Sequence, residues 1–347
     1  MADARPGHRI DARPGHRIDA RPGHRIDARP GRACPLGYRY GAGLLKSAAA
    51  FETETLYVAG GLYGNPFALE SLLDAFAAEH GDKALVFNGD FHWFDLDPVD
   101  FLRVNRTVRS HVATRGNVET ELVSPSVAGG CGCGYPEWVG EAEVERSNRI
   151  IERLRRTAHQ VPEELAQLAA LPMVALAQIR GVRIAAVHGD ADSLAGWDFS
   201  QERLATPAGR AAAAAAFPAA GVRIFASSHT CLPVLLSLDA SPGACAIVNN
   251  GAAGMPNFRG TRYGLATRIS VRPARAAGVY GARVAGLHVD ALALHYDADA
   301  WRAHFLAQWP AGSDAHASYY KRIAEGPQYA PRQALRRDQL LHAAVAE

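Results

Sequence analysis

The stretch LYVAGGLYGNPFALESLL, which runs from Leu56 to Leu73, predicts a buried strand, a sharp turn and a helix in succession. Asn65 is a favourable N-cap and Pro66 suits the first position of a helix. The helix then places apolar residues on one face: Leu69, Leu72, Leu73 and Phe76. The turn itself carries Gly61 and Tyr63, where a catalytic turn would be expected to supply carboxylates or imidazoles.

The composition is typical of a globular protein, with 347 residues, 48% apolar and 21% charged. We find no apolar run long enough to span a membrane, and the net charge of +2 gives no reason to expect nucleic-acid binding. The five cysteines form no regular framework, which favours a reducing compartment. We therefore expect a cytoplasmic protein; the sequence does not indicate its oligomeric state.

The first residues form a tandem octapeptide, DARPGHRI, which begins at Asp3, Asp11 and Asp19 and recurs in broken form at Asp27. Proline and glycine in every copy disfavour a helix or strand. We expect a disordered tail over residues 1–32, a globular domain over 33–300 with its core motifs in 55–272, and a helical C-terminal extension over 301–347. Strand and helix patterns alternate first and consecutive strands follow, which favours a layered α/β fold with mixed sheets.

Several predicted strands end in a turn of small residues that carries one side chain able to bind a metal. These turns are NGD, RGN, VHGD and SSHT, and their polar residues are Asp90, Asn117, His188 and His229. Strands of one sheet bring their ends to a common edge. The sequence therefore predicts that the four side chains converge.

The order of GGLYGN, NGD, RGN, VHGD, SSHT and NNGAAGMPN resembles the motif order of the calcineurin-like metallophosphoesterase superfamily, in particular its small bacterial phosphodiesterase and dinucleotide-phosphatase branch. The resemblance implies a four-layer αββα sandwich, an α/β (α+β) fold in which two mixed sheets are flanked by helices. Members of the superfamily hold two metal ions, with a phosphoryl group lying across both.

Residue by residue, the resemblance implies one complete metal site and one degenerate site. The complete site has its four ligands in place: Asp90, Asn117, His188 and His229. At the degenerate site Gly61, Tyr63 and Cys231 replace an aspartate and two histidines. Cys231 could still ligate a metal or could be a small buried residue, and the sequence leaves both readings open.

The implied activity is metal-dependent hydrolysis of a phosphomonoester or phosphodiester, with nucleotides among the candidate substrates and metal-bound hydroxide as the nucleophile. The ligand set suits Mn, Fe or Zn, with one ion per chain expected and two as the alternative. His92 would point the same way as Asp90 on an extended strand, so His92 and Tyr63 are the candidates for assisting catalysis. The alternative reading is a non-catalytic or regulatory protein that binds a metal or a phosphoester.

Two further groups of residues are candidates for binding. Substrate could be bound by Asn65, Arg115, Asn250 and Gly251, although each also has a plain structural or solvent-exposed reading. An extra thiol site for zinc or iron could form from Cys34, Cys131 and Cys133. The alternative for these cysteines is a flexible glycine-rich loop with incidental thiols.

Overall fold

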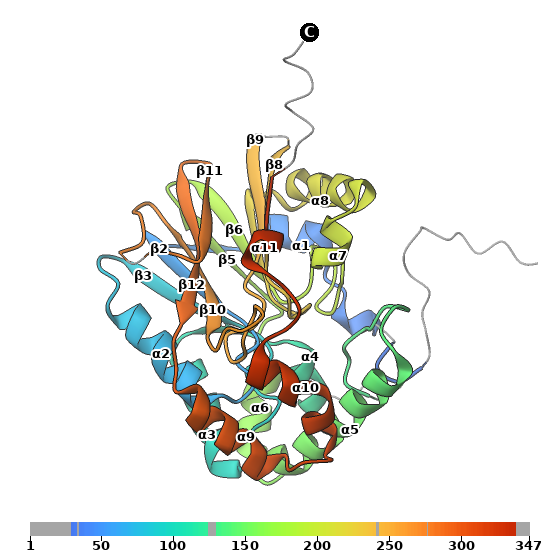
Figure 1. Cartoon of the computed structure of the whole chain (residues 1–347). Coiled ribbons are helices and arrows are strands. Elements are labelled where there is room, and N and C mark those ends of the chain that lie inside the picture. The colour runs from blue at the N-terminus through green and yellow to red at the C-terminus, as the bar shows by residue number, and fades with distance from the viewer. Residues whose placement is uncertain (1–28, 33–34, 124–129, 241–242, 276, 338–347) are drawn as a thin grey trace, which may run out of the picture.

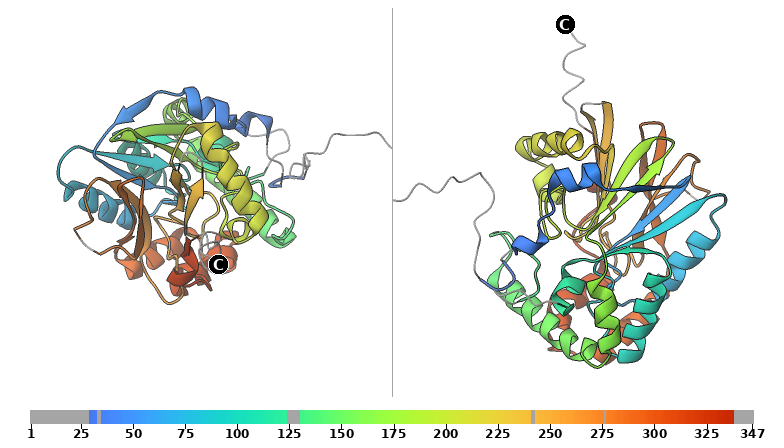
Figure 2. Two further views of the ribbon diagram at one scale, coloured as in Figure 1. Left: turned by 90° about the horizontal axis from the view of Figure 1, so that it is seen from above. Right: turned by 180° about the vertical axis from the view of Figure 1, so that it is seen from behind.

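The protein is a sandwich of two β-sheets whose outer faces are covered by helices (Figure 1). Two further views show α8 (Pro207–Ala220) and α2 (Pro66–Ala77) on opposite sides of the sheet pair (Figure 2). This is the four-layer arrangement of two mixed sheets that the sequence predicted. The computed structural model describes residues 29–32, 35–123, 130–240, 243–275 and 277–337.

The six-stranded sheet has the order β11-β12-β10-β2-β3-β4. Strands β2, β3 and β4 are mutually parallel, whereas β10 and β12 pair antiparallel to their neighbours. The carboxyl ends of the three parallel strands therefore meet at one edge. The strands are β2 (Thr55–Ala59), β3 (Lys83–Asn88), β4 (Val112–Thr114), β10 (Gly264–Ser270), β11 (Tyr280–Val284) and β12 (Leu287–Leu294).

The seven-stranded sheet has the order β1-β5-β6-β7-β9-β8-β13. Its central strands β6, β7 and β9 are parallel, so this sheet also delivers several carboxyl ends to one edge. The strands are β1 (Ala50–Glu52), β5 (Val174–Ile179), β6 (Val182–Val187), β7 (Ile224–Ser227), β8 (Val234–Ala240), β9 (Gly243–Asn249) and β13 (Leu335–Arg337).

The alternation of side chains along each strand separates the core into layers. In β2, Leu56 and Val58 belong to the cluster between the two sheets, whereas Tyr57 and Ala59 belong to the cluster beneath the helices. In β7, Phe225 belongs to a third cluster, on the outer face of the seven-stranded sheet. Both sheets are thus buried on both faces, which explains why their strands read as nearly continuous apolar runs.

The helices begin at recognisable caps. In α2 the Asn65 side chain accepts hydrogen bonds from the amides of Phe67 and Ala68, as its position before Pro66 predicts. No helix in the described part of the chain is long and apolar enough to cross a membrane. The others are the 3₁₀ helix Leu36–Tyr38, α1 (Gly41–Ser47), α3 (Pro98–Arg109), α4 (Asn117–Val123), α5 (Glu141–Ala158), α6 (Pro162–Ala169), α7 (Gln201–Leu204), α9 (Ala298–Gln308), α10 (Asp314–Glu325) and α11 (Pro331–Ala334).

The two ends of the described chain are built into the domain. The octapeptide copies up to residue 28 lie outside the described residues. Residues 29–32 differ from the expected tail, because Arg32 is buried and donates hydrogen bonds to Glu141 and to the Pro136 carbonyl. The C-terminal segment is helical, but it is no appendage: Trp301 and Phe305 lie in the core, and β13 extends the seven-stranded sheet.

A buried ion pair joins β10 to the end of α2. Arg268 is only 1% exposed, and its guanidinium donates to both carboxylate oxygens of Glu79, at 2.6 and 3.1 Å. The Tyr57 hydroxyl donates to the same carboxylate at 3.0 Å. Because a buried guanidinium without a counter-charge is costly, the pair depends on both partners.

We expect Glu79→Gln to lower the free energy of unfolding by about 3 kcal/mol, because it removes the bidentate counter-charge of the buried Arg268 and leaves only the single contact of 3.3 Å with Asp290. The measurement is urea-induced unfolding at neutral pH. The matched control is Glu54→Gln, which breaks the exposed Glu54–Arg272 pair (2.8 Å) and is expected to cost at most about 1 kcal/mol. Equal losses in the two variants would contradict the prediction.

The same pair predicts a pH dependence. The Arg268 hydrogen bonds lower the pKa of Glu79 from its ordinary value of 4.5. The folded state therefore holds the proton less tightly than the unfolded state, and the stabilisation is fully present above pH 4.5 and is lost as the pH falls through the folded-state pKa. The difference in unfolding free energy between the wild type and Glu79→Gln should be constant above that range and shrink below it. A difference that grows on acidification would be inconsistent with this assignment.

Candidate metal centre

The four predicted metal-binding side chains lie together where the two sheets meet. Asp90 follows β3 and Asn117 follows β4 in one sheet, whereas His188 follows β6 and His229 follows β7 in the other. His188 Nε2 lies 3.2 Å from Asn117 Oδ1, 3.3 Å from Asp90 Oδ2 and 3.3 Å from His229 Nδ1. One ligand atom from each of Asp90, His188 and His229 can be chosen so that all lie within 4.8 Å of one another.

Backbone carbonyls fix the orientation of three of these side chains. A carbonyl can only accept, so the nitrogen that faces it must carry the hydrogen. The pairs are His188 Nδ1 with Asn88 O (2.8 Å), His229 Nε2 with Cys133 O (2.9 Å) and Asn117 Nδ2 with Cys131 O (2.9 Å). In the neutral imidazoles this leaves Nε2 of His188 and Nδ1 of His229 as lone-pair acceptors, and it turns Asn117 Oδ1 towards them.

Acceptor atoms therefore face one another across short distances. Two imidazole lone pairs, an amide oxygen and a carboxylate cannot satisfy each other, and the side chains are buried away from bulk water. Either a proton or a cation must occupy the space between them. One carboxylate, one amide oxygen and two imidazoles form a donor set that suits a divalent transition metal, and the tethering of each histidine to a carbonyl is the arrangement found around protein-bound metals.

The titration of the cluster without a metal reflects this crowding. Burial would raise the pKa of Asp90, but the neighbouring His188 and His229 and the Val118 amide hold it below its usual value. Burial would lower the pKa of His188, and the Asp90 carboxylate raises it instead. Burial and the charge of His188 lower the pKa of His229 to about 4, so His229 is neutral at physiological pH. Neutral imidazole is the form that binds metals.

Glu119 organises the turn that carries Asp90. Its carboxylate accepts from the amides of Asp90 and Gly116, at 2.8 Å each, and from those of Phe91 and His92, at 3.1 and 3.3 Å. Asp90 adopts a positive φ of 52°, a conformation that costs about 1–3 kcal/mol and persists only where the surroundings enforce it. A Cβ atom at Gly116 would lie 2.2 Å from Asp90 Oδ1, so glycine is needed there.

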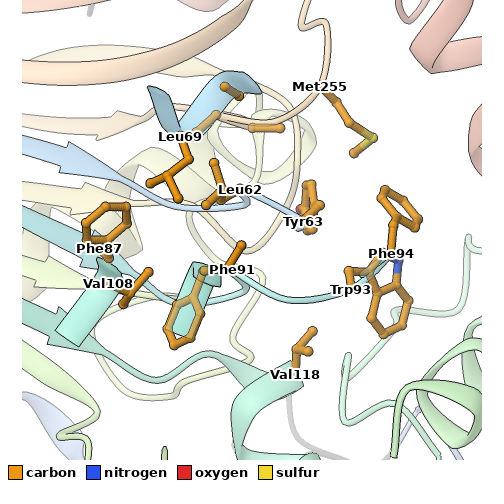
Figure 3. Packing of buried hydrophobic residues seen from close by; sticks show 14 of the residues in the cluster. Leu62, Tyr63, Leu69, Phe87, Phe91, Trp93, Phe94, Val108, Val118 and Met255 are labelled. Carbon is orange, nitrogen blue, oxygen red and sulfur yellow. The ribbon is translucent and has the colours of Figure 1, made fainter. Parts of the chain in front are cut away.

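A tyrosine and a cysteine pair with each other beside the cluster. The Tyr63 hydroxyl lies 2.9 Å from Cys231 Sγ, and both residues have positive φ, 56° and 61°. Burial raises the pKa of both side chains, so both are protonated at neutral pH. Figure 3 shows the Tyr63 ring between Leu62 on one side and Trp93 and Phe94 on the other.

A pocket of about 240 Å³ opens beside the acceptor cluster. Asp90, Asn117, His229, Tyr63 and Cys231 line it from one side. Its remaining wall is largely aromatic and was not anticipated from the sequence: Trp93, Tyr135, Trp197 and Tyr319, with Val118, Val139, Glu143, Thr230 and Cys133 between them. The site residues therefore share a concave, mostly apolar surface, which is the usual form of a small-molecule site.

His92 does not line this pocket. Its ring stacks on Phe101 with centroids 3.8 Å apart, and its Nδ1 lies 2.5 Å from Asp95 Oδ2. The expectation that it shares the direction of Asp90 assumed an extended chain. The positive φ of Asp90 breaks that alternation and directs His92 into the core.

The expected substrate-binding residues have structural partners instead, and none of them lines the pocket. Asn65 caps α2 and donates to the Gly254 carbonyl, and Asn250 donates to the carbonyls of Gly60 and Leu265. A Cβ atom at Gly251 would meet Asn257 Oδ1 at 2.2 Å, so this glycine serves close packing. Arg115 donates to the Ala169 carbonyl at 3.4 Å.

Two of the three cysteines of the expected thiol site are described, and they pair with each other. Cys131 and Cys133 are joined as a disulfide, with their Cα atoms 5.3 Å apart, because Gly132 between them bends the chain at a φ of 66°. Cys34, the third candidate thiol, lies outside the described residues. The segment Cys131–Gly132–Cys133, here called the CGC loop, contributes its backbone carbonyls to the site. The Cys131 carbonyl accepts from Asn117, and the Cys133 carbonyl accepts from His229.

Comparison with known proteins gives a likeness of fold. No family model and no curated protein matches the sequence. Among solved structures, hypothetical protein PH1004 from Pyrococcus horikoshii OT3 matches with a TM-score of 0.53 at 14% identity, over 79% of this chain and 99% of that one. A metallophosphoesterase from Sphaerobacter thermophilus matches with a TM-score of 0.49 at 19% identity, over 79% of this chain and all of that one. The chain therefore shares its fold with PH1004, and the two mixed sheets flanked by helices are the architecture that the order of its motifs predicted.

Proposed function

We propose that this protein is a metal-dependent phosphoesterase that binds one divalent metal between Asp90, Asn117, His188 and His229. The observation that carries the proposal is the convergence of four acceptor groups, three of them tethered from behind by backbone carbonyls. Mn, Fe and Zn all fit the donor set. When bound, such an ion would polarise a phosphoryl oxygen and bring the pKa of a coordinated water towards about 7.

The chain's own residues would position the phosphoryl group. Asp90, Asn117 and His229 line the pocket together with Tyr63, which the motif resemblance aligns with a ligand of a second metal. Because burial keeps the Tyr63 hydroxyl protonated, it can donate a hydrogen bond to a phosphoryl oxygen. The mostly apolar wall would limit water around the reacting group.

The first test is metal binding. We expect the purified protein, stripped with a chelator and titrated with Mn²⁺ or Zn²⁺, to bind one ion per chain, measured by calorimetry and elemental analysis. At a free metal concentration of one hundred times Kd the unfolding free energy should rise by about 2.7 kcal/mol. Asp90→Asn and His188→Ala should abolish both effects.

The matched control for metal binding is His159→Ala, since His159 is exposed at the end of α5 and lies outside the cluster. Wild-type binding in the Asp90 and His188 variants would refute the metal assignment. Stoichiometric metal without hydrolysis of any phosphoester would instead favour the alternative function, a regulatory or binding protein on this fold. That alternative draws its support from Tyr63 and Cys231, because the motif resemblance aligns both with metal ligands that this sequence replaces.

The second test concerns Tyr63. We expect Tyr63→Phe to lower kcat for hydrolysis of a phosphodiester by about tenfold to a hundredfold, because one preorganised hydrogen-bond donor is removed. Metal affinity should be unchanged, since Tyr63 does not belong to the acceptor cluster. Tyr320→Phe is the control, because Tyr320 lies on α10 and does not line the pocket. A Tyr63→Phe enzyme with wild-type kcat would remove Tyr63 from the catalytic machinery.

A further inference from the structure

One wall of the pocket is a set of aromatic rings next to the metal-binding side chains. Trp197 is held firmly: its indole N–H donates to the Cys133 carbonyl at 3.0 Å, and its ring lies 5.5 Å from the His229 ring at an interplanar angle of 76°. Tyr135 follows at 5.9 Å from Trp197. Its hydroxyl lies 3.0 Å from Ser147 Oγ. The planes of the two rings are 47° apart, so each presents a separate apolar face that is already fixed by its hydrogen bond.

The same pocket has no lysine or arginine among the described residues that line it. Its wall instead includes the Glu143 carboxylate. Arg146 is engaged by Glu143 at 2.6 Å and by Ser318 at 2.7 Å. Arg322 donates to the carbonyls of Cys231 and Pro256, at 2.7 and 3.1 Å. Neither guanidinium lines the pocket, where a phosphate would need it.

The charge that the site can offer is therefore small. A divalent cation combined with the Asp90 carboxylate and neutral ligands leaves a net charge of one positive unit. A phosphodiester carries one negative charge and would neutralise it. A phosphomonoester is largely a dianion at neutral pH, since its second pKa is about 6. It would leave an uncompensated negative charge in a partly buried site that no lysine or arginine lines and in which Glu143 is already paired with Arg146, which is unfavourable.

We propose, on the basis of the phosphoesterase function above, that the substrate is a singly charged phosphodiester with a planar aromatic group that stacks on Trp197 and meets the tilted ring of Tyr135 at its edge. In its hydrolysis a water oxygen bonds to phosphorus while the bond from phosphorus to the leaving oxygen breaks. The leaving oxygen takes up one proton of the water, the other proton is released to solvent at neutral pH, and the products are a phosphomonoester dianion and an alcohol or phenol. The product carries one more negative charge than the substrate, so the pocket releases it and does not hydrolyse it further.

The test uses three substrates with one leaving group: bis(para-nitrophenyl) phosphate, ethyl para-nitrophenyl phosphate and para-nitrophenyl phosphate. The first two differ only in the aromatic group that is retained, and the third carries the extra charge. We expect kcat/KM to be highest for the bis-aryl diester and lowest for the monoester. For each substrate, the kcat/KM of a variant is divided by that of the wild type. The intrinsic reactivity of the compound is the same in both values and cancels.

Trp197→Ala should lower the preference for the bis-aryl over the ethyl diester by about tenfold, which is typical of a lost stacking partner. Trp197→Phe keeps a ring but loses the hydrogen bond to Cys133, and it should retain most of the preference. Tyr320→Ala is the control, because Tyr320 lies on α10, does not line the pocket and has its ring stacked on His316, away from Trp197. Loss of the preference in Trp197→Phe as well would assign Trp197 a role in holding the loop and would overturn the stacking claim.

Glu143→Arg should raise kcat/KM for the monoester relative to the diester by about tenfold, because a cation replaces an anion in the wall. Glu145→Arg introduces the same charge change on the same helix, but Glu145 is exposed and does not line the pocket. We expect this control to leave the ratio unchanged. Equal changes in the two variants would mean that the overall charge, and not the pocket wall, sets the selectivity.

A binding experiment gives a readout that does not depend on turnover. Calorimetry with the metal-loaded protein should show that diphenyl phosphate binds at least about tenfold more tightly than phenyl phosphate or diethyl phosphate. Hydrolysis of all three substrates with the monoester preferred would overturn this inference and leave the phosphoesterase function standing. Absence of metal binding and of hydrolysis of any substrate would instead overturn the proposed function itself.

Discussion

The site depends on the hydrogen bonds by which Asn88 connects the two sheets. The Asn88 side chain donates to the Val187 carbonyl at 2.8 Å and accepts from the Thr114 hydroxyl at 3.1 Å. The Asn88 backbone carbonyl accepts from His188 Nδ1. One residue at the end of β3 thereby ties together the ends of β3, β4 and β6. The buried polar groups of these strand ends satisfy each other, and the side chains that follow them are brought into contact.

Hydrogen bonds hold the site's side chains rigidly, and their acceptor atoms repel one another. The carbonyls that hold Asn117 and His229 belong to the CGC loop, whereas the carboxylate that holds the Asp90 turn belongs to Glu119 at the start of α4. These contacts leave the acceptor atoms no freedom to turn away from one another. Holding these acceptor groups together costs free energy when nothing lies between them. A cation between them would relieve this repulsion, so the free energy of folding already includes the cost of arranging the side chains.

The sequence predicted what is encoded locally. The layered fold and the grouping of Asp90, Asn117, His188 and His229 could be predicted because each residue follows a recognisable strand and parallel strands share an edge. His92 was misplaced because the left-handed turn at Asp90 leaves no mark in the sequence pattern. The aromatic wall could not be predicted, since Trp93, Tyr135, Trp197 and Tyr319 come from four separate segments that only the tertiary fold brings together.

Three residues beside the pocket, Tyr63, Asp90 and Cys231, have left-handed backbone conformations. Their side chains are a phenol, a carboxylate and a thiol, so no single kind of side chain accounts for the strained backbone, and the packing of the turns has to maintain it. The Tyr63 hydroxyl and the Cys231 thiol lie 2.9 Å apart, and burial raises the pKa of both, so they add no charge to the pocket at neutral pH. The charged side of the pocket is therefore confined to the Asp90 cluster, and the ring of Trp197, 5.5 Å from the His229 ring, places apolar surface directly beside it.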